Sequence, residues 1–363
     1  MSILKDTLPA KISSVAKNLH PAYFALVMAT GIVSISSMFL RFELIAWWLF
    51  WINIFFYISL WFLTALRIIF HTSDFLRDLK DHNKGPGFFT IIAGTCVLGS
   101  QFVIIKEDLQ IAVILWLLGA FTWIILTYTF FTIVTIKEDK PPLEKGINGT
   151  WLIIIVSTQS VAILGTLIIP AYYEFKEVMY FSMFVMFLIG CMLYIIIIAL
   201  IFYRLFFFKL SPSELTQPYW INMGAVAITT LAGSVLILNS SYSNLHQGII
   251  AFVEGFTLFF WSIGTWWIPL LFIFGYWRHI YKKFSLKYDP QYWGMVFPLG
   301  MYVACTYKLS EALELEFLKI ISQYFIYIAL AAWSVSFILL VYHTINGWKG
   351  LKSSNEATSS KNY

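Results

Sequence analysis

Charged residues are scarce in this sequence. Only 12% of its 363 residues are Asp, Glu, Lys or Arg, whereas 60% belong to the hydrophobic set. A soluble domain carries about 25% charged residues, so this chain has too little charge to cover a water-facing surface, and lipid must cover most of it. The 24 basic residues are spread over many short loops rather than gathered in one patch. This distribution argues against a nucleic-acid partner.

Cysteine and recognisable chemical motifs are scarce as well. The three cysteines, Cys96, Cys191 and Cys305, all fall in apolar segments, so the sequence predicts neither a disulfide framework nor a cysteine metal site. The six histidines are scattered singly without metal-ligand spacing, and no phosphate-binding loop is present. We therefore expect no metal, no cofactor, no catalytic residue and no ATP-driven pumping.

The N-terminal segment does not have the pattern of a signal peptide, because its first nineteen residues contain three lysines and no continuous apolar stretch. Three apolar residues there have helical spacing and indicate a short interfacial helix, with a disordered tail as the alternative: Ile12, Val15 and Leu19. The predicted organisation is a cytoplasmic segment over residues 1–19, a transmembrane domain over residues 20–346 and a cytoplasmic tail over residues 347–363.

Long apolar runs dominate the rest of the chain. A helix needs about 20 mostly apolar residues to cross the hydrocarbon core of a bilayer. On this rule the sequence predicts an all-α membrane protein with ten transmembrane helices. The predicted spans are 22–40, 44–70, 87–105, 109–135, 148–170, 177–207, 219–238, 246–277, 291–308 and 317–345.

The positions of the basic residues predict the orientation. If the N-terminus is cytoplasmic, 19 of the 24 Lys and Arg residues lie on the inner side, and only five lie on the outer side. Cytoplasmic loops of membrane proteins carry such an excess of positive charge. We therefore expect a multi-pass protein of the plasma membrane with both termini in the cytoplasm, and with no basic residue in the middle of the membrane.

The odd and even spans differ in composition. Small and hydroxyl residues concentrate in the odd spans, whereas the even spans are longer and bulkier. Small residues allow helices to approach closely, and polar ones belong against protein or water rather than lipid. This alternation predicts five helical hairpins with the odd helices as an inner ring; a compact bundle in which small residues only permit packing is the alternative. The predicted pore-lining residues are Thr30, Gly31, Ser34, Gly94, Thr95, Thr158, Gln159, Thr229, Thr230, Gly233, Gly300 and Thr306.

Three segments carry a family resemblance. They are residues 20–34 (HPAYFALVMATGIVS), residues 259–271 (FFWSIGTWWIPLL) and residues 292–300 (YWGMVFPLG). They resemble the tellurite-resistance/dicarboxylate transporter family, which includes fungal malate permeases and the slow-type anion channels of guard cells. The resemblance implies a quasi-fivefold ring of inner helices around a pore, a homotrimer with one pore per protomer, and an aromatic gate in the ninth helix.

Phe297 stands where the resemblance places the occluding phenylalanine of the gate, directly before Pro298. Proline removes one helical hydrogen bond and kinks a helix. A bulky ring beside such a kink can close a pore by excluding water. The leading interpretation is transport of a small anion, namely chloride, nitrate or a C4 dicarboxylate such as malate. Hydroxyls, amides and helix ends would bind it weakly in a pore without basic residues.

Two other interpretations remain open. Glu254 is the acidic residue well within a span, and it shares a helical stripe with Leu258, Ser262 and Thr265 that we expect to face the inner helices. An intramembrane carboxylate indicates function by default, so Glu254 is a possible proton site of a proton-coupled carboxylate carrier. A hydrogen-bonded structural carboxyl is the alternative role.

The segment over residues 74–81 (DFLRDLKD) is the basis of an enzyme interpretation. Membrane enzymes that transfer prenyl groups hold a diphosphate through magnesium on paired acidic clusters, and oxygen ligands suit that ion. The matching later loop offers only Glu214 as a second acidic group. The interleaved Arg77 and Lys80 favour a solvated amphipathic helix instead.

Overall fold

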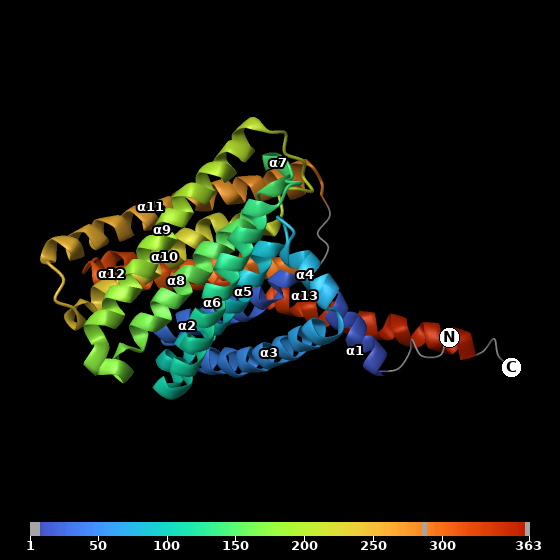
Figure 1. Cartoon of the computed structure of the whole chain (residues 1–363), viewed down its shortest axis with the longest axis horizontal. Helices are drawn as coiled ribbons and strands as arrows, with labels where there is room; N and C mark the ends of the chain where they lie inside the picture. The colour runs from blue at the N-terminus through green and yellow to red at the C-terminus, as the bar shows by residue number, and fades with distance from the viewer. Residues whose placement is uncertain (1–7, 285–288, 360–363) are drawn as a thin grey trace.

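The computed structural model describes the backbone of residues 8–284 and 289–359, and the side chains of residues 12–284 and 289–345. Helices make up 87% of the structure, and no strand occurs in the described part of the chain. The prediction of an all-α membrane protein is confirmed. The long helices run side by side as one bundle, from which the end of α13 projects (Figure 1).

In the described part of the chain, ten long helices make up the bundle and fall into two sets that alternate along the chain. The inner set is α2 (Ala25–Phe39), α5 (Phe89–Gln101), α8 (Ile153–Leu167), α10 (Ile221–Leu238) and α12 (Trp293–Ala312). The outer set is α3 (Glu43–Phe70), α6 (Leu109–Ile136), α9 (Lys176–Phe207), α11 (Gln247–Tyr276) and α13 (Lys319–Ser359). Three short helices precede or join them: α1 (Leu8–Lys17), α4 (Thr72–Leu79) and α7 (Leu143–Gly146).

Nine helical segments among the described residues are long and apolar enough to cross a membrane. They correspond to nine of the ten predicted spans, and most of their bounds lie within three residues of the predicted ones. The exception is α12, over the predicted span 291–308, because its glycine, proline, tyrosine and charged residues lower its hydropathy. A tenth crossing by α12 therefore stays a prediction.

Burial separates the two sets. The apolar windows of the spans that contain α2, α5, α8 and α10 are 78–94% buried within the protein, whereas those of the outer set are only 22–39% buried. Most residues of α12 are buried as well. The outer helices therefore present large apolar surfaces to the surroundings, as lipid-facing helices do.

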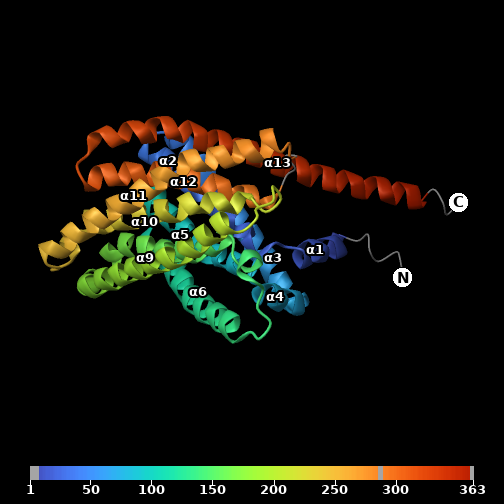
Figure 2. The ribbon, with the colours of Figure 1, turned by 90° about the horizontal axis from the view of Figure 1, so that it is seen from above.

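The inner helices pack against one another in a closed order. Helix α2 contacts α5, α5 contacts α8, α8 contacts α10, α10 contacts α12, and α12 contacts α2 again. Each outer helix packs against the inner helix that precedes it in the chain, so that the chain forms five hairpins. Each also touches the inner helix of the next hairpin, and these contacts tie the hairpins together. Figure 2 shows the bundle from above.

Two glycines allow the inner helices to approach their neighbours. A Cβ added to Gly224 of α10 would lie 2.7 Å from Pro298 Cγ of α12, and one added to Gly233 would lie 2.0 Å from Thr257 of α11. Atoms cannot approach so closely, so a larger residue at either position would have to displace its neighbour. Close approach at small residues is a general basis of helix association in membranes.

The inner helices also begin alike, each with a 3₁₀ turn. These turns are η2 (Pro21–Phe24), η3 (Gly85–Phe88), η5 (Gly149–Leu152), η7 (Gln217–Trp220) and η10 (Pro290–Tyr292). Four of the five contain a proline at the first or second position. Proline suits a helix start because the N–H that it lacks has no intrahelical partner there. A shared proline start is a further sign of repeated hairpins.

The predicted terminal segments have helical structure. The expected N-terminal helix is present as α1, which packs against α3, and its Ser13 hydroxyl is hydrogen-bonded to His71 Nε2 at 3.0 Å. Its position at a membrane interface stays a prediction. Helix α13 runs on to Ser359, so the predicted domain boundary at residue 346 does not coincide with a helix end. Helix α1 and the end of α13 lie at the same end of the bundle in both views (Figures 1 and 2).

Candidate functional site

The larger of two cavities among the inner helices, here called the outer cavity, has a volume of about 230 Å³. All five inner helices line it, and its walls are mostly apolar. Representative lining residues, one from each helix, are Ile32, Val97, Ile163, Leu231 and Met301. Ser100 and Ser160 contribute its hydroxyl groups. A cavity that five helices share lies on the axis about which they pack.

The second cavity, here called the inner cavity, lies toward the N-terminal ends of the same helices and has a volume of about 30 Å³. It is also lined from all five hairpins. Representative residues are Met28, Thr90, Val156, Ile221 and Phe297. The volume is about that of one water molecule in the liquid, so the inner cavity is nearly closed.

The two cavities lie on one axis and share no lining residue. On α2, Met28 lines the inner cavity and Ile32 the outer one; on α12, Phe297 lines the inner cavity and Met301 the outer one. Positions four apart lie on one face of a helix and are about 6 Å apart along its axis. The barrier between the cavities is therefore about one helical turn thick.

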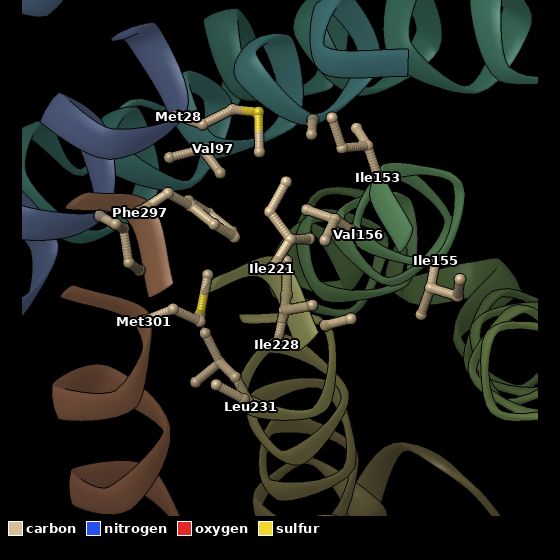
Figure 3. Packing of buried hydrophobic residues seen from close by; sticks show 14 of the residues in the cluster. Met28, Val97, Ile153, Ile155, Val156, Ile221, Ile228, Leu231, Phe297 and Met301 are labelled. Carbon is tan, nitrogen blue, oxygen red and sulfur yellow. The ribbon is translucent and has the colours of Figure 1, made fainter. Parts of the chain in front are cut away.

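Phe297 lies in this barrier. Its side chain is only 1% exposed, and Figure 3 shows its ring among side chains that converge from all five inner helices. Met28 and Val97 lie on one side of the ring, Met301 on another, and Ile221 beyond its tip (Figure 3). Pro298 points away from the cavities, toward Gly224 of α10. The surroundings of Phe297 are apolar, which disfavours water in the narrow passage.

The predicted pore-lining residues have other surroundings than these two cavities, and their role in a pore stays a prediction. None of the twelve lines either cavity. The hydroxyls of Thr30, Thr95, Thr158 and Thr306, all buried, are hydrogen-bonded to aromatic side chains of outer helices instead. The others bond to helix backbone or lie at close helix contacts: Gly31, Ser34, Gly94, Gln159, Thr229, Thr230, Gly233 and Gly300. A polar residue in a membrane helix is satisfied equally by a protein partner, so its type alone does not identify a pore.

The four aromatic hydrogen bonds follow one pattern. Tyr57 of α3 bonds to Thr95 of α5 at 3.0 Å, and Trp123 of α6 donates to Thr158 of α8 at 2.9 Å. The other two pairs are Trp261–Thr306 at 2.9 Å and Trp333–Thr30 at 3.0 Å. In every case an outer helix is bonded to the inner helix of the next hairpin. These threonines therefore hold the hairpins together.

The sequence analysis missed two titratable residues that line the cavities. Lys308 lines the outer cavity, where its ammonium lies 2.7 Å from Glu311 and 4.7 Å from the centre of the Phe39 ring. This corrects the expectation of a pore without basic residues. His20 lines the inner cavity, and its Nδ1 accepts the Ala22 N–H at 3.1 Å. Burial lowers the pKa of His20, which favours the neutral imidazole.

Glu254 is half-buried, but the stripe predicted for it does not face the inner helices along its length. Leu258 and Ser262 are exposed, whereas Thr265 is hydrogen-bonded to Tyr302 of α12 at 2.9 Å. The inward face of α11 consists of other residues, among them Val253, Thr257 and Phe260. Glu254 lines neither cavity. The prediction that its stripe faces the inner ring is therefore wrong. Its role as a proton site stays a hypothesis.

The acidic segment over residues 74–81 forms α4 and the turn after it. Asp78 is buried and bound to Arg67 at 2.5 Å and to Lys84 at 3.1 Å, while Asp74 pairs with Arg77. Burial alone would raise the pKa of Asp78, but the hydrogen bonds from Arg67 and Lys84 outweigh it and hold the pKa below its ordinary value. These carboxylates are engaged by basic side chains, and no metal-ligand cluster occurs among the described residues.

The chain is similar in sequence to a known family and to several known proteins. Residues 18–341 match the family described as voltage-dependent anion channel (SLAC1). Two uncharacterized transporters of Methanocaldococcus jannaschii are 26% and 27% identical to the chain; the alignments cover 93% and 89% of this chain and 98% and 93% of those proteins. An uncharacterized membrane protein of Mycobacterium tuberculosis is 35% identical over 42% of this chain and 76% of its own length.

The family match spans most of the chain, and with it both cavities, nine of the ten long helices described and the first part of α13. The chain belongs to the voltage-dependent anion channel family. It is accordingly a membrane protein of anion transport.

Proposed function

We propose that this protein conducts small anions along the axis of its inner helices, and that Phe297 closes the path. The observation that carries the proposal is the pair of coaxial cavities separated by one turn of apolar side chains. Two cavities that five helices surround, with one aromatic ring between them, have the arrangement of a gated pore. Dewetting of an apolar constriction prevents the passage of ions without a large mechanical plug.

The outer cavity supports an anionic substrate. Lys308 lies on its wall in an ion pair with Glu311. The hydroxyls of Ser100 and Ser160 donate to carbonyls of their own helices and can rotate to donate to an anion instead. The remaining lining is apolar, so binding is weak, which allows rapid release. Chloride, nitrate and a C4 dicarboxylate such as malate are the substrates to compare. The closed order of inner helices and the apolar outer surface further support a quasi-fivefold ring of ten crossings with a pore in each protomer.

The assembly and its setting are part of the proposal. We infer a homotrimer in the plasma membrane, with both chain ends in the cytoplasm. The basic asymmetry of the loops supports the orientation. The position of α1 and the end of α13 at the same end of the bundle is compatible with termini on one side. An enzyme role through residues 74–81 has no support, since the buried Asp78 is paired with basic groups.

Flux through proteoliposomes tests the function. The purified protein is reconstituted, and efflux of chloride, nitrate and malate is recorded with and without a proton gradient. The Phe297→Ala variant is expected to conduct more than the parent, because it opens a gap about the size of a phenyl ring, and Phe297→Leu is expected to lie between them.

The matched control is Phe260→Ala. Phe260 is also fully buried but lines neither cavity. Either truncation removes a packed ring and costs about 3–5 kcal/mol of stability, so only Phe297→Ala should combine that loss with higher flux. Equal flux in the parent and in a correctly assembled Phe297→Ala protein would refute Phe297 as the gate. Absence of anion flux in both would refute the conduction pathway.

A further inference from the structure

Three outer helices carry a buried arginine near the end of the bundle that holds α1. Arg67 lies in the last turn of α3, Arg204 in that of α9, and Arg278 in the π-helical turn Trp277–Tyr281 that follows α11. Their residues are 3%, 7% and 8% exposed, respectively. A guanidinium removed from water requires hydrogen bonds or an opposite charge to offset its lost hydration.

Two of the three arginines have such partners within the protein. Arg67 donates to the Leu19 carbonyl at 2.6 Å and forms the ion pair with Asp78. Arg204 donates to the Ile147 carbonyl at 2.9 Å and to the Tyr219 hydroxyl, and lies 3.6 Å from Glu214. Both guanidinium groups tie an outer helix to a neighbouring loop. Their role is structural.

Arg278 differs from these two. The described part of the chain supplies its guanidinium with no carboxylate or carbonyl partner. Its Nε is buried without a hydrogen bond, as is that of Arg67, but the other two guanidinium nitrogens of Arg67 are paired. Its nearest interaction is with the Phe284 ring, whose centre lies 4.6 Å from the guanidinium carbon. An aromatic face attracts a cation but does not accept its several N–H groups as a carboxylate or phosphate would. Among the described residues, the guanidinium therefore has no partner that an oxyanion would have to displace.

A cavity of about 170 Å³ adjoins Arg278. It lies between the end of α11 and the beginnings of α10 and α12, and side chains able to donate hydrogen bonds line it beside the arginine. These are Thr216, Gln217, Trp220, His279 and Tyr292. The volume is that of about five liquid water molecules, which is enough for a phosphate group.

The Arg278 cavity is separate from the conduction axis. Pro218 and Gly294 line the inner cavity, whereas Tyr219 and Met295, the next residues along the chain, line the Arg278 cavity. It therefore lies on the lipid side of these segments. Phe272 and Tyr276 of α11 are 50% and 60% exposed beside it. Such a surface suits the acyl chains and headgroup region of a lipid.

The charge around the cavity is positive. Lys282 and Lys283 follow on the exposed surface within five residues of Arg278, and His279 adds a titratable group. Asp289 is the acidic residue near Arg278, and its carboxylate accepts the Gln291 N–H at 2.8 Å. Basic pockets between membrane helices bind the headgroups of anionic lipids on the cytoplasmic side of a membrane.

We propose that the Arg278 cavity binds the phosphate of an anionic phospholipid headgroup. The guanidinium and the neighbouring N–H and O–H groups hold the phosphate oxygens, Lys282 and Lys283 add attraction for the net negative charge, and the aromatic surface of α11 contacts the acyl chains. Free phosphate has the same oxyanion chemistry but gains nothing from that surface. The bound lipid then supplies the counter-charge that Asp78 and Glu214 supply to the other two arginines.

The test uses the purified full-length protein in a neutral detergent, with phosphatidylglycerol, phosphatidylcholine or inorganic phosphate added at equal ionic strength. Bound lipid is counted by native mass spectrometry, and the unfolding temperature is recorded. We expect phosphatidylglycerol to bind and to raise the unfolding temperature of the parent. Arg278→Gln is expected to weaken this binding about tenfold to a hundredfold, since charge-assisted hydrogen bonds are lost. Arg278→Lys should retain part of it.

Two control variants make the test specific. Arg77→Gln removes the same charge from an exposed side chain and should leave lipid binding unchanged. In lipid-free detergent Arg67→Gln breaks a buried ion pair and lowers the unfolding temperature, whereas Arg278→Gln breaks none and should unfold at or above the parent temperature.

Three results would overturn the proposal. A loss of stability in lipid-free Arg278→Gln as large as that in Arg67→Gln would mean that Arg278 has a partner within the protein. If Arg77→Gln weakened lipid binding as much as Arg278→Gln, the lipid would bind through the overall positive charge of the protein and not at the Arg278 cavity. Protection by inorganic phosphate equal to that by phosphatidylglycerol would identify a free-anion site in place of a lipid site.

Discussion

Replacing Thr158 by valine separates a packing role from a pore role for the hydroxyls of the inner helices. Thr158 is fully buried, and its Oγ1 accepts the Trp123 indole N–H at 2.9 Å across the contact between α8 and α6. Valine has the same shape, so the substitution removes the acceptor without opening a cavity. The indole N–H is then left buried without a partner.

The expected cost follows from this geometry. A buried donor that loses its acceptor destabilises a protein by about 1–3 kcal/mol, and interhelical hydrogen bonds in membranes fall near the lower end of that range. For a chain of this length the unfolding temperature should fall by about 1–4 °C. Anion flux should not change, because Thr158 lines neither cavity.

Ser160 of the same helix provides the matched comparison. It lines the outer cavity, and its hydroxyl donates only to the Val156 carbonyl within α8. Ser160→Ala should therefore leave the unfolding temperature nearly unchanged and lower anion flux by about twofold to tenfold, as expected for one hydrogen bond. Thermal unfolding in detergent and flux in proteoliposomes measure the two quantities. Loss of flux in Thr158→Val with normal stability would contradict the assignment of the threonines to packing.

Three further predictions concern the ion pair, the orientation and proton coupling. Asp78→Asn should lower the free energy of unfolding by about 3–5 kcal/mol, because Arg67 keeps a buried charge. Since the folded pKa of Asp78 is lowered, the parent should lose this stability only as pH falls below about 4, in denaturation at a series of pH values. A cysteine at Ser241 should react with an impermeant maleimide only from outside, and a cysteine at Ser213 only from inside. Reaction of both from the same side would contradict the proposed topology. Glu254→Gln should leave flux and its response to a proton gradient unchanged, and loss of a proton-driven component would favour a carrier.

The helices and their two classes are readable from the sequence. Membrane spans depend on a local property, the mean apolarity of about 20 residues, and most bounds of nine spans were predicted to within three residues. The division into buried and lipid-facing helices also follows from composition, since small residues in one set and bulky residues in the other reflect different surroundings. Phe297 was singled out through a family resemblance, and its place between the cavities could not have been derived from a Phe-Pro pair.

Which residues line the cavities follows only from the tertiary structure. A helix such as α8 is buried on all sides, with 89% of its apolar window inside the protein, so its sequence contains no polar stripe that marks the axis. From the sequence, a threonine hydroxyl could face the axis or an outer helix. The tertiary structure decides between the two, because Trp123 and its counterparts on the outer helices donate hydrogen bonds to these hydroxyls. Likewise, the sequence by itself placed Arg67, Arg204 and Arg278 at one end of the bundle. Which of these arginines has a partner depends on the loops that fold against it, because ion pairs and cavities form between segments far apart in the chain.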